Sequence, residues 1–434
     1  MEDMKKILIV APIFGKDLGA GATNNFHLAL SLSNSFEIYV LAVNSSGKKN
    51  NYFYKNLHVK YSSPGLFHLL HLIIQFFKKN LTHSNSSFKE KNRKERIILT
   101  NYHVLFKLKR KLLVPDTFID WLPVGVMDGF KCIRKEKIDI IISSATPYTS
   151  HLVSYILSKL FNIPLVLYYR DPWVIEKSVK RGNLRFKFES YLERKIISAA
   201  KLLIFCTEST RQAYCRLFQL SSNKTATVYF GFDQNDFDYS LSPHKGNNIN
   251  LVYGGRILPG QRNIVPLLRA LSKLPPNFPL HIDLFIKEGA SYYYELIKKF
   301  NVEKFIHLLP PLTHKEFCHR LRKYDYLILL GNVDPLQIPS KLYDYIGSRR
   351  PIFLIRNNQR KDETFKIVSA MSNSIISNND VDDIKEALYN MVEFKKSNRI
   401  VQTPLDFVSK FTWSEREKEY LELIKNVINE GNIS

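Results

Sequence analysis

Three residues near position 340 place a hydroxyl, an ammonium group and a carboxylate within one turn of an expected helix. Ser340 and Lys341 are adjacent, and Asp344 follows three residues after the lysine. If the helix begins near Ser340, free backbone amides, a hydroxyl and a lysine meet at its N-terminus, which is an arrangement that binds phosphate. Asp344 then lies on the same face, where a carboxylate can accept hydrogen bonds from ribose hydroxyls. The alternative is a capped helix with an ion pair between Lys341 and Asp344.

Paired glycines and two arginines upstream have the composition of a second anion-binding loop. Gly254 and Gly255 follow the apolar run that ends at Tyr253; Arg256 comes directly afterwards and Arg262 six residues later. Glycines let a ligand approach the backbone closely, and the planar guanidinium group suits a diphosphate. We therefore expect Arg256 and Arg262 to neutralise a diphosphate; the alternative for Arg262 is a solvated helix residue.

Polar residues also follow three expected strands in the first half of the chain. They are Gly19 and Gly21 after strand 7–11, Thr146 after strand 138–143, and Arg170 with Asp171 after strand 164–169. The carboxyl ends of parallel strands form one edge of a sheet, where ligands commonly bind. An Arg-Asp pair at that edge is in place for catalysis or substrate binding, although it could instead be a structural ion pair that locks the loop.

The elements that must position these residues alternate between strand and helix patterns, which favours parallel sheets with helices on both faces. The expected strands are 7–11, 38–43, 138–143, 164–169, 201–206 and 226–229, then 250–253, 280–286, 306–309, 326–330, 352–355 and 373–376. The polar stretch 233–250 is the candidate linker. The fold class is therefore α/β with two Rossmann-like domains, residues 1–235 and 249–410, followed by a helical segment at 411–434.

Composition limits the class of protein further. The four cysteines among 434 residues include no close pair, so we expect a reduced compartment and neither disulfides nor a zinc site. No stretch approaches the roughly 18 apolar residues that cross a bilayer, which predicts a soluble or peripheral protein. The formal net charge of +23 indicates partners that carry phosphate or other anions. His27, His151 and His244 are isolated, and a structural role is expected for each.

Residues 64–113 do not fit the alternating pattern and are expected to form an insertion. An apolar segment, 66–77, precedes a stretch, 78–113, that carries eleven Lys or Arg and two Glu. An apolar segment beside basic residues is what an anchor at an anionic membrane surface requires. The alternative is a core helix followed by a solvated loop.

Taken together, these motifs resemble GT-B glycosyltransferases of family 4, many of which act in bacterial surface-polysaccharide assembly. The segments that carry the resemblance are the N-terminal strand with its glycine loop, 144–147, 170–173, 231–233, 255–271, 338–347 and the final helix from Trp413. The resemblance implies two domains facing across a cleft, with the terminal helix packed back on the N-terminal domain. It covers nearly the whole chain apart from residues 50–115.

The resemblance also implies roles for individual residues. Arg262 and Lys341 would hold the donor diphosphate, Asp344 the ribose, and Pro311 and Leu312 the base. The acceptor would bind near Gly19–Gly21 and Asp171. Two positions depart from the family pattern: Leu336 stands where a glutamate is common, with Asp334 two residues earlier, and Phe230 replaces an asparagine before Gly231.

The expected activity is transfer of a sugar from a nucleoside-diphosphate sugar of the UDP or GDP type to a glycan or lipid-linked acceptor, with retention of configuration and without a metal or another cofactor. Electrostatic stabilisation of the leaving diphosphate by Arg262, Lys341 and a helix N-terminus would be the main catalytic effect. The expected location is cytoplasmic, on the inner face of the cytoplasmic membrane. The alternatives are a sugar-nucleotide epimerase of the same fold and a basic nucleic-acid-binding protein, although no nucleic-acid-binding signature is present.

Overall fold

The computed structural model describes residues 4–15, 19–43, 52–54, 56–65, 113–176, 181–243, 245–257, 262–286, 289–358, 360–372 and 374–431. The expected insertion at 64–113, apart from its first two residues and its last, lies outside these ranges, and so does His244. The chain divides into two compact units. The first comprises residues 1–206, 214–226 and 420–434, and the second comprises 207–213 and 227–419.

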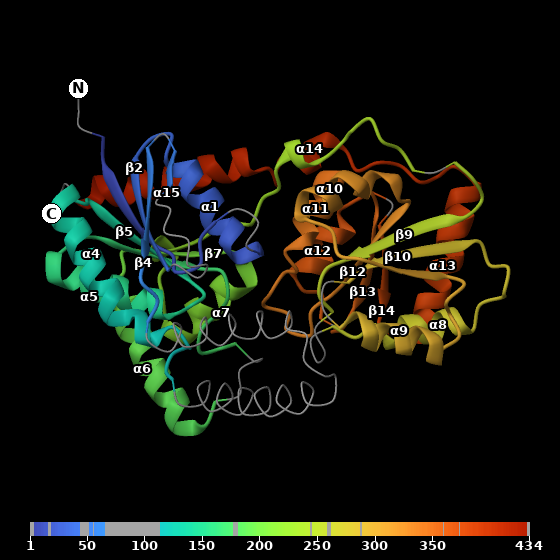
Figure 1. The fold of residues 1–434 in the computed structure, drawn as a ribbon, viewed down its shortest axis with the longest axis horizontal. Helices are drawn as coiled ribbons and strands as arrows, with labels where there is room; N and C mark the ends of the chain where they lie inside the picture. Colours follow the sequence, from blue (N-terminus) through green and yellow to red (C-terminus); the bar gives the residue numbers. More distant parts are fainter. Residues whose placement is uncertain are drawn as a thin grey trace, which may run out of the picture. The chain divides into compact units, whose positions relative to one another are not determined.

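The first unit is built on a sheet of eight strands in the order β3-β4-β2-β1-β5-β6-β7-β8 (Figure 1). The strands are β1 (Lys6–Val10), β2 (Glu37–Val43), β3 (Tyr52–Tyr54), β4 (Leu57–Ser62), β5 (Ile140–Ala145), β6 (Leu165–Tyr169), β7 (Leu202–Phe205) and β8 (Thr225–Thr227). The central strands pair in parallel, and only the short β3 runs antiparallel to its neighbour among the pairings whose register is described. Strands such as β5 and β6 are buried along their whole length, which is why they read as continuous apolar runs.

Helices cover this sheet and close its core. They are α1 (Ala20–Leu32), α4 (Leu122–Glu136), α5 (Thr149–Phe161), α6 (Asn183–Ala199) and α7 (Glu208–Phe218). Ile133 of α4, Leu157 of α5 and Ile196 of α6 pack in one apolar cluster with Leu8 and Leu165 of the strands. The loops that follow the strands are therefore anchored at both ends by elements that pack in this cluster.

The second unit has a fully parallel sheet of six strands in the order β11-β10-β9-β12-β13-β14. The strands are β9 (Ile249–Gly254), β10 (Leu280–Phe285), β11 (Ile306–Leu309), β12 (Tyr326–Leu330), β13 (Ile352–Arg356) and β14 (Ile375–Asn378). One face packs against α8 (Val265–Ser272), α9 (Ala290–Lys299) and α13 (Val381–Lys396). The other packs against α10 (His314–Arg320), α11 (Lys341–Ser348), α12 (Glu363–Ser369) and α14 (Leu405–Ser409), as Figure 1 shows.

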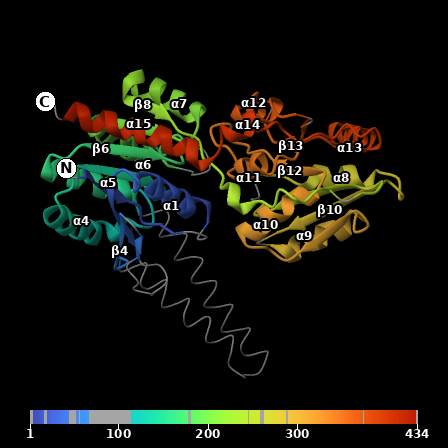
Figure 2. The same cartoon turned by 90° about the horizontal axis from the view of Figure 1, so that it is seen from above.

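The predicted α/β class with two Rossmann-like domains is confirmed by these two sheets. The last helix, α15 (Trp413–Gly431), contributes its residues from Tyr420 onward to the first unit. There the Tyr420 hydroxyl donates to the Tyr168 hydroxyl of β6 at 3.0 Å, and Figure 2 shows the helix alongside that strand. The apolar face of this helix consists of Tyr420, Ile424 and Val427, which are all buried.

The stretch 233–250, expected as a linker, belongs to the second unit and packs into it where the structure describes it, at 233–243 and 245–250. Phe237 is buried in the cluster beneath α10 and α11, and the Tyr239 hydroxyl donates to the Gly347 carbonyl at 3.0 Å. Arg322 lies over the Tyr239 ring and donates to the Leu241 carbonyl. The turn-rich composition hid these contacts because their partners lie about 80 to 110 residues away along the chain.

Candidate functional site

Lys341, the first residue of α11, lies at the carboxyl edge of the second sheet. Its Nζ donates to the Gly254 carbonyl at the end of β9, 2.5 Å away, and lies 4.0 Å from the centre of the Tyr253 ring. Ser340 precedes it as an exposed residue whose side chain makes no capping hydrogen bond. The helix therefore begins where the sequence predicted, with a lysine and a hydroxyl together at its positive end. Its amides at Leu342 and Tyr343 donate to the carbonyls of Pro339 and Ser340.

Arg262 brings a second positive charge to Lys341. The Arg262 side chain donates from Nε to Asn332 Oδ1 at 3.0 Å and from Nη1 to the Arg256 carbonyl at 3.3 Å. Burial, and then the charge of Arg262, hold the pKa of Lys341 well below its usual range. Within the part of the chain that the structure describes, neither cation forms an ion pair with a carboxylate. The protein thus holds two like charges together with uncharged acceptors, as a site for an anion does.

The alternative of an ion pair between Lys341 and Asp344 is not what the structure contains. Asp344 Oδ1 instead lies 3.1 Å from His314 Nε2, while Nδ1 of the same ring lies 3.7 Å from Asp236. His314 opens α10, directly after the predicted base-binding residues Pro311 and Leu312 and the capping Thr313. The predicted ribose and base contacts are therefore neighbours in the structure, and His314, which sequence reasoning missed, joins them.

Gly255 lets the loop after β9 approach Lys341. Its φ of +109° lies in the region that side chains disfavour, and a Cβ there would stand 3.0 Å from Lys341 Nζ. Arg256 follows with an exposed side chain, while its carbonyl accepts hydrogen bonds from Tyr253 and Arg262. Arg262 is thus held in place, whereas the Arg256 side chain is exposed to solvent.

The loop between β12 and α11 contains Asp334, which lies two residues before Leu336, the position where the family commonly has a glutamate. Asp334 Oδ1 accepts the Leu336 amide at 3.1 Å, whereas Oδ2 is buried and, among the described residues, has no hydrogen-bond partner. Leu336 turns its carbonyl to the hydroxyls of Thr207 and Thr210, each 2.9 Å away. Asp334 therefore offers an unused acceptor oxygen in the loop where the family's glutamate is absent.

The predicted acceptor residues also come together, in the first unit. Asp171 Oδ2 accepts the Thr146 hydroxyl at 2.9 Å, and Arg170 donates to the carbonyls of Ala145 and Thr146. Gly21, near the start of α1, lies against Arg170 so closely that a Cβ would stand 2.0 Å from its Nη1. Gly19 precedes the helix with φ of +105°. Three loops that are far apart in sequence thus meet at one edge of the sheet.

A buried polar network behind this edge was not predicted. Trp173 donates through its indole to Glu189 at 3.0 Å and through its amide to the Tyr214 hydroxyl at 2.7 Å. The Tyr214 hydroxyl donates in turn to Glu193 Oε1 at 2.6 Å, and the Val174 amide donates to Oε2 at 3.1 Å. Both glutamates come from α6 and are fully buried. They fix the loop that carries Arg170 and Asp171.

We expect Glu193 to make the first unit less stable as the pH rises from about 4.5 to 7. Burial raises the pKa of Glu193 from 4.5 to about 7, so the native state binds the proton more tightly than the unfolded chain does. In this window the unfolding free energy falls with rising pH, by about 3 kcal/mol for such a shift. The difference in unfolding free energy between wild type and Glu193→Gln should show that slope; a difference that stays constant with pH would contradict it.

The remaining reactive groups of the first unit have structural positions. His151 is fully buried beside the Ser143 hydroxyl, 2.7 Å away, and burial lowers its pKa to about 3. His27 is buried as well, which agrees with the structural role expected for both histidines. All four cysteines are free thiols, and burial raises the pKa of Cys206.

Comparison with protein families gives one match. Residues 82–236 match the model described as Glycosyltransferase Family 4. No curated protein sequence matches the chain. Among the described residues, no helix is both long and apolar enough to cross a membrane. The family match confirms the resemblance that the motifs indicated.

Solved structures share the fold along almost the whole chain. Sucrose-phosphate synthase from Thermosynechococcus elongatus superimposes with a TM-score of 0.68 at 11% identity, over 98% of this chain and 99% of its own. HepE from Anabaena, in complex with UDP and glucose, gives 0.63 at 12% identity over 98% and 100%. The lipopolysaccharide outer core galactosyltransferase WaaB gives 0.61 at 11% identity over 98% and 99%. At these identities the likeness establishes the GT-B fold.

An epimerase shares the fold less closely. A UDP-N-acetylglucosamine 2-epimerase superimposes with a TM-score of 0.53 at 11% identity, over 100% of this chain and 97% of its own. Fold alone therefore does not separate transfer from epimerisation, and the residues of the site must do so.

Proposed function

We propose that this GT-B chain, which matches the family 4 glycosyltransferases over residues 82–236, transfers a sugar from a nucleoside-diphosphate sugar to a glycan or lipid-linked acceptor. The family match and the shared fold support a transferase. The finer assignment rests on one observation, the convergence of Lys341 and Arg262 at the start of α11.

The two cations suit a diphosphate leaving group. A dianionic group beside Lys341 and Arg262 would relieve their mutual repulsion and accept charge-assisted hydrogen bonds from both. As the bond between sugar and diphosphate breaks, negative charge grows on the bridging oxygen. Preorganised cations and the dipole at the N-terminus of α11 would stabilise that charge more in the transition state than in the ground state. In this account Lys341 and Arg262 supply the positive charge, and retention of configuration is expected.

The rest of the donor would extend along the same edge of the second sheet. Asp344 is placed to accept ribose hydroxyls once its contact with His314 opens, and the Pro311–Leu312 loop beside α10 is placed to contact the base. The unbonded Oδ2 of Asp334 could accept a hydroxyl of the donor sugar. Because HepE was solved with UDP and glucose, UDP-glucose is the first donor to test.

On the first unit, Thr146, Arg170 and Asp171 would bind the acceptor hydroxyls. Asp171 follows Arg170 and accepts a hydrogen bond from Thr146, which holds its carboxylate in place. A carboxylate held in this way can orient an attacking hydroxyl. Gly19 and Gly21 would let the acceptor approach the backbone of the loop before α1.

The proposal is tested by incubating the purified protein with nucleotide sugars, with and without glycan or lipid-linked acceptors. Transfer predicts release of nucleoside diphosphate that depends on the acceptor. An epimerised nucleotide sugar formed without acceptor would instead support the epimerase alternative. Retention of RNA in a salt-sensitive manner, with no binding of any nucleotide sugar, would support the nucleic-acid alternative.

The acceptor is proposed to be carried by a lipid at the inner face of the cytoplasmic membrane. The support is the sequence of residues 66–113, where an apolar segment adjoins a basic stretch. In vesicle flotation we expect binding to anionic liposomes, and loss of binding when Lys107, Lys109, Arg110 and Lys111 are all replaced by Glu. Equal flotation of this variant and wild type would contradict the membrane proposal.

A further inference from the structure

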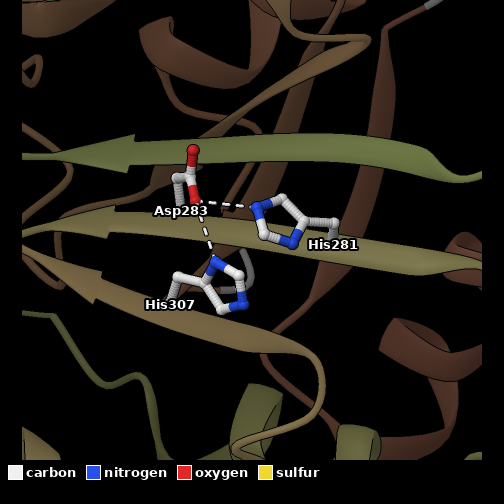
Figure 3. Close-up of side chains that lie close together, drawn as sticks. All are labelled: His281, Asp283 and His307. Atoms are coloured by element: carbon white, nitrogen blue, oxygen red, sulfur yellow. Dashed lines mark hydrogen bonds and ion pairs between the residues drawn. The ribbon is translucent and has the colours of Figure 1, made fainter. Parts of the chain in front are cut away.

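Two neighbouring strands of the second unit bring two histidines and a carboxylate together on one face. His281 and Asp283 stand two residues apart on β10, so their side chains point to the same side of the sheet. His307 on the edge strand β11 is the register partner of Asp283. Figure 3 shows the two imidazole rings next to one another beside the carboxylate, with both dashed lines ending on the same oxygen.

The distances suit three ligands of one small cation. Asp283 Oδ1 lies 2.8 Å from His281 Nε2 and 4.0 Å from His307 Nδ1, and all three candidate ligand atoms lie within 4.8 Å of one another. A tetrahedral zinc ion with bonds of about 2.0–2.1 Å separates its ligands by about 3.4 Å. That spacing lies between the two separations from Asp283 Oδ1 that the structure contains, 2.8 Å and 4.0 Å.

The carboxylate is already oriented for this task. The Tyr324 hydroxyl donates to Asp283 Oδ2 at 2.6 Å. Oδ1 is thereby left facing the two imidazoles. A hydrogen bond from a neighbour to the second atom of a metal-binding group is the usual support of a metal site.

Access and ligand chemistry also fit a metal ion. The side chains of His281, Asp283 and His307 are 27%, 15% and 57% exposed, so an ion can enter from solvent and keep water in its remaining positions. Two imidazoles and one carboxylate are ligands that zinc and similar divalent ions accept. An ion pair with Asp283 Oδ1 needs only one histidine. Here two histidines lie beside this oxygen, and their ring centres are 4.3 Å apart in an edge-to-face arrangement.

We infer that His281, Asp283 and His307 form a binding site for a divalent transition-metal ion of the zinc type, supported by Tyr324. The cluster lies toward the amino ends and middle of the strands, because His281 is paired with Asn250, whereas β9 ends four residues later at Gly254. The ion would therefore not take part in sugar transfer. It would tie the edge strand β11 to β10 and stabilise the strand that leads into the Pro311–Leu312 loop.

A second group, His314, Cys318 and Asp344, also has ligand-type atoms close together, but it belongs to the donor site already described. It supplies the matched control. The variant His314→Ala removes a histidine from that group and leaves the proposed site untouched.

The test uses full-length protein without a polyhistidine tag, titrated with Zn²⁺ by calorimetry and followed by thermal unfolding. We expect one tight site in wild type and in His314→Ala, and its loss in His281→Ala and in His307→Ala. Tyr324→Phe should weaken it by about 10- to 100-fold, because it removes only the supporting hydrogen bond. The melting temperature should rise with Zn²⁺ only in proteins that keep the site.

Two results would overturn the inference. One is equal Zn²⁺ affinity in wild type, His281→Ala and His307→Ala, which would place the metal elsewhere among the twelve histidines of the chain. The other is the absence of tight binding in wild type. Titration of the variants with Co²⁺ adds an independent readout, since a tetrahedral site absorbs visible light much more strongly than hexahydrated Co²⁺ does.

Discussion

Replacing Lys341 by Ala is expected to lower sugar transfer by about 10²- to 10³-fold, the loss typical of removing one preorganised group that stabilises transition-state charge. The residual rate would come from Arg262 and from the dipole of α11. The affinity for nucleoside diphosphate should fall in parallel, because the same ammonium binds the ground-state ligand. Steady-state transfer and equilibrium binding of the diphosphate measure the two effects separately.

The structure also predicts that this variant folds. In the free protein Lys341 is partly buried beside the charge of Arg262, which is why its pKa is lowered, so loss of the side chain removes repulsion as well as contacts. The melting temperature without ligand should therefore stay close to that of wild type. Lys299→Ala, at an exposed position in the last turn of α9, is the control. Equal transfer by Lys341→Ala and Lys299→Ala would remove Lys341 from the donor site.

Replacing Glu189 by Ala should destabilise the first unit by about 3–5 kcal/mol, as expected when a buried ion pair loses one partner. Glu189 is fully buried and lies 2.7 Å from Arg181 Nε and 2.5 Å from Arg185 Nε, and it also accepts the Trp173 indole. Without it, two arginines lose their carboxylate in a site where their side chains are only 6% and 18% exposed. Chemical denaturation followed by tryptophan fluorescence measures this loss, because Trp173 is itself buried against Glu189.

Two further variants make the measurement specific to the buried ion pair. Glu189→Gln keeps an oxygen acceptor for the Trp173 indole and should lose less stability than Glu189→Ala. Glu295→Ala, at an exposed position of α9, should change the unfolding free energy by no more than about 0.5 kcal/mol. A loss below 1 kcal/mol for Glu189→Ala would contradict the importance given to the network behind the Arg170–Asp171 loop.

The site residues that could be predicted from the sequence share one property: each belongs to a pattern of neighbouring residues in the chain. The start of α11 could be predicted from Ser340, Lys341 and Asp344 because a helix N-terminus is written in consecutive residues. Gly21 and Arg170, 149 positions apart, were both selected because each follows a strand, and parallel strands bring such positions to one edge. The two-domain fold followed from the alternation of strand and helix patterns for the same reason.

The features that sequence analysis missed depend on contacts that no local pattern records. Arg262 is held by Asn332, which is 70 residues away, and Asp344 meets His314 across 30 residues. Glu189 and Glu193 read as polar positions on α6, and only the packing of Trp173 and Tyr214 over them shows that they are buried. The sequence does indicate that His281 and Asp283 share one face of a strand, because they alternate with apolar residues. It does not indicate that His307 lies beside them, because that depends on how β11 pairs with β10.

The most direct test of the donor site is the melting temperature of wild type and Lys341→Ala in the presence of UDP, GDP and their sugars. A ligand that binds the native state at about 100 times its Kd stabilises it by about 2.7 kcal/mol. We expect at least one of these nucleotides to raise the melting temperature of wild type, and the rise to be lost in Lys341→Ala and kept in Lys299→Ala. No rise with any nucleotide, or an equal rise in Lys341→Ala, would contradict a nucleoside-diphosphate site at the start of α11.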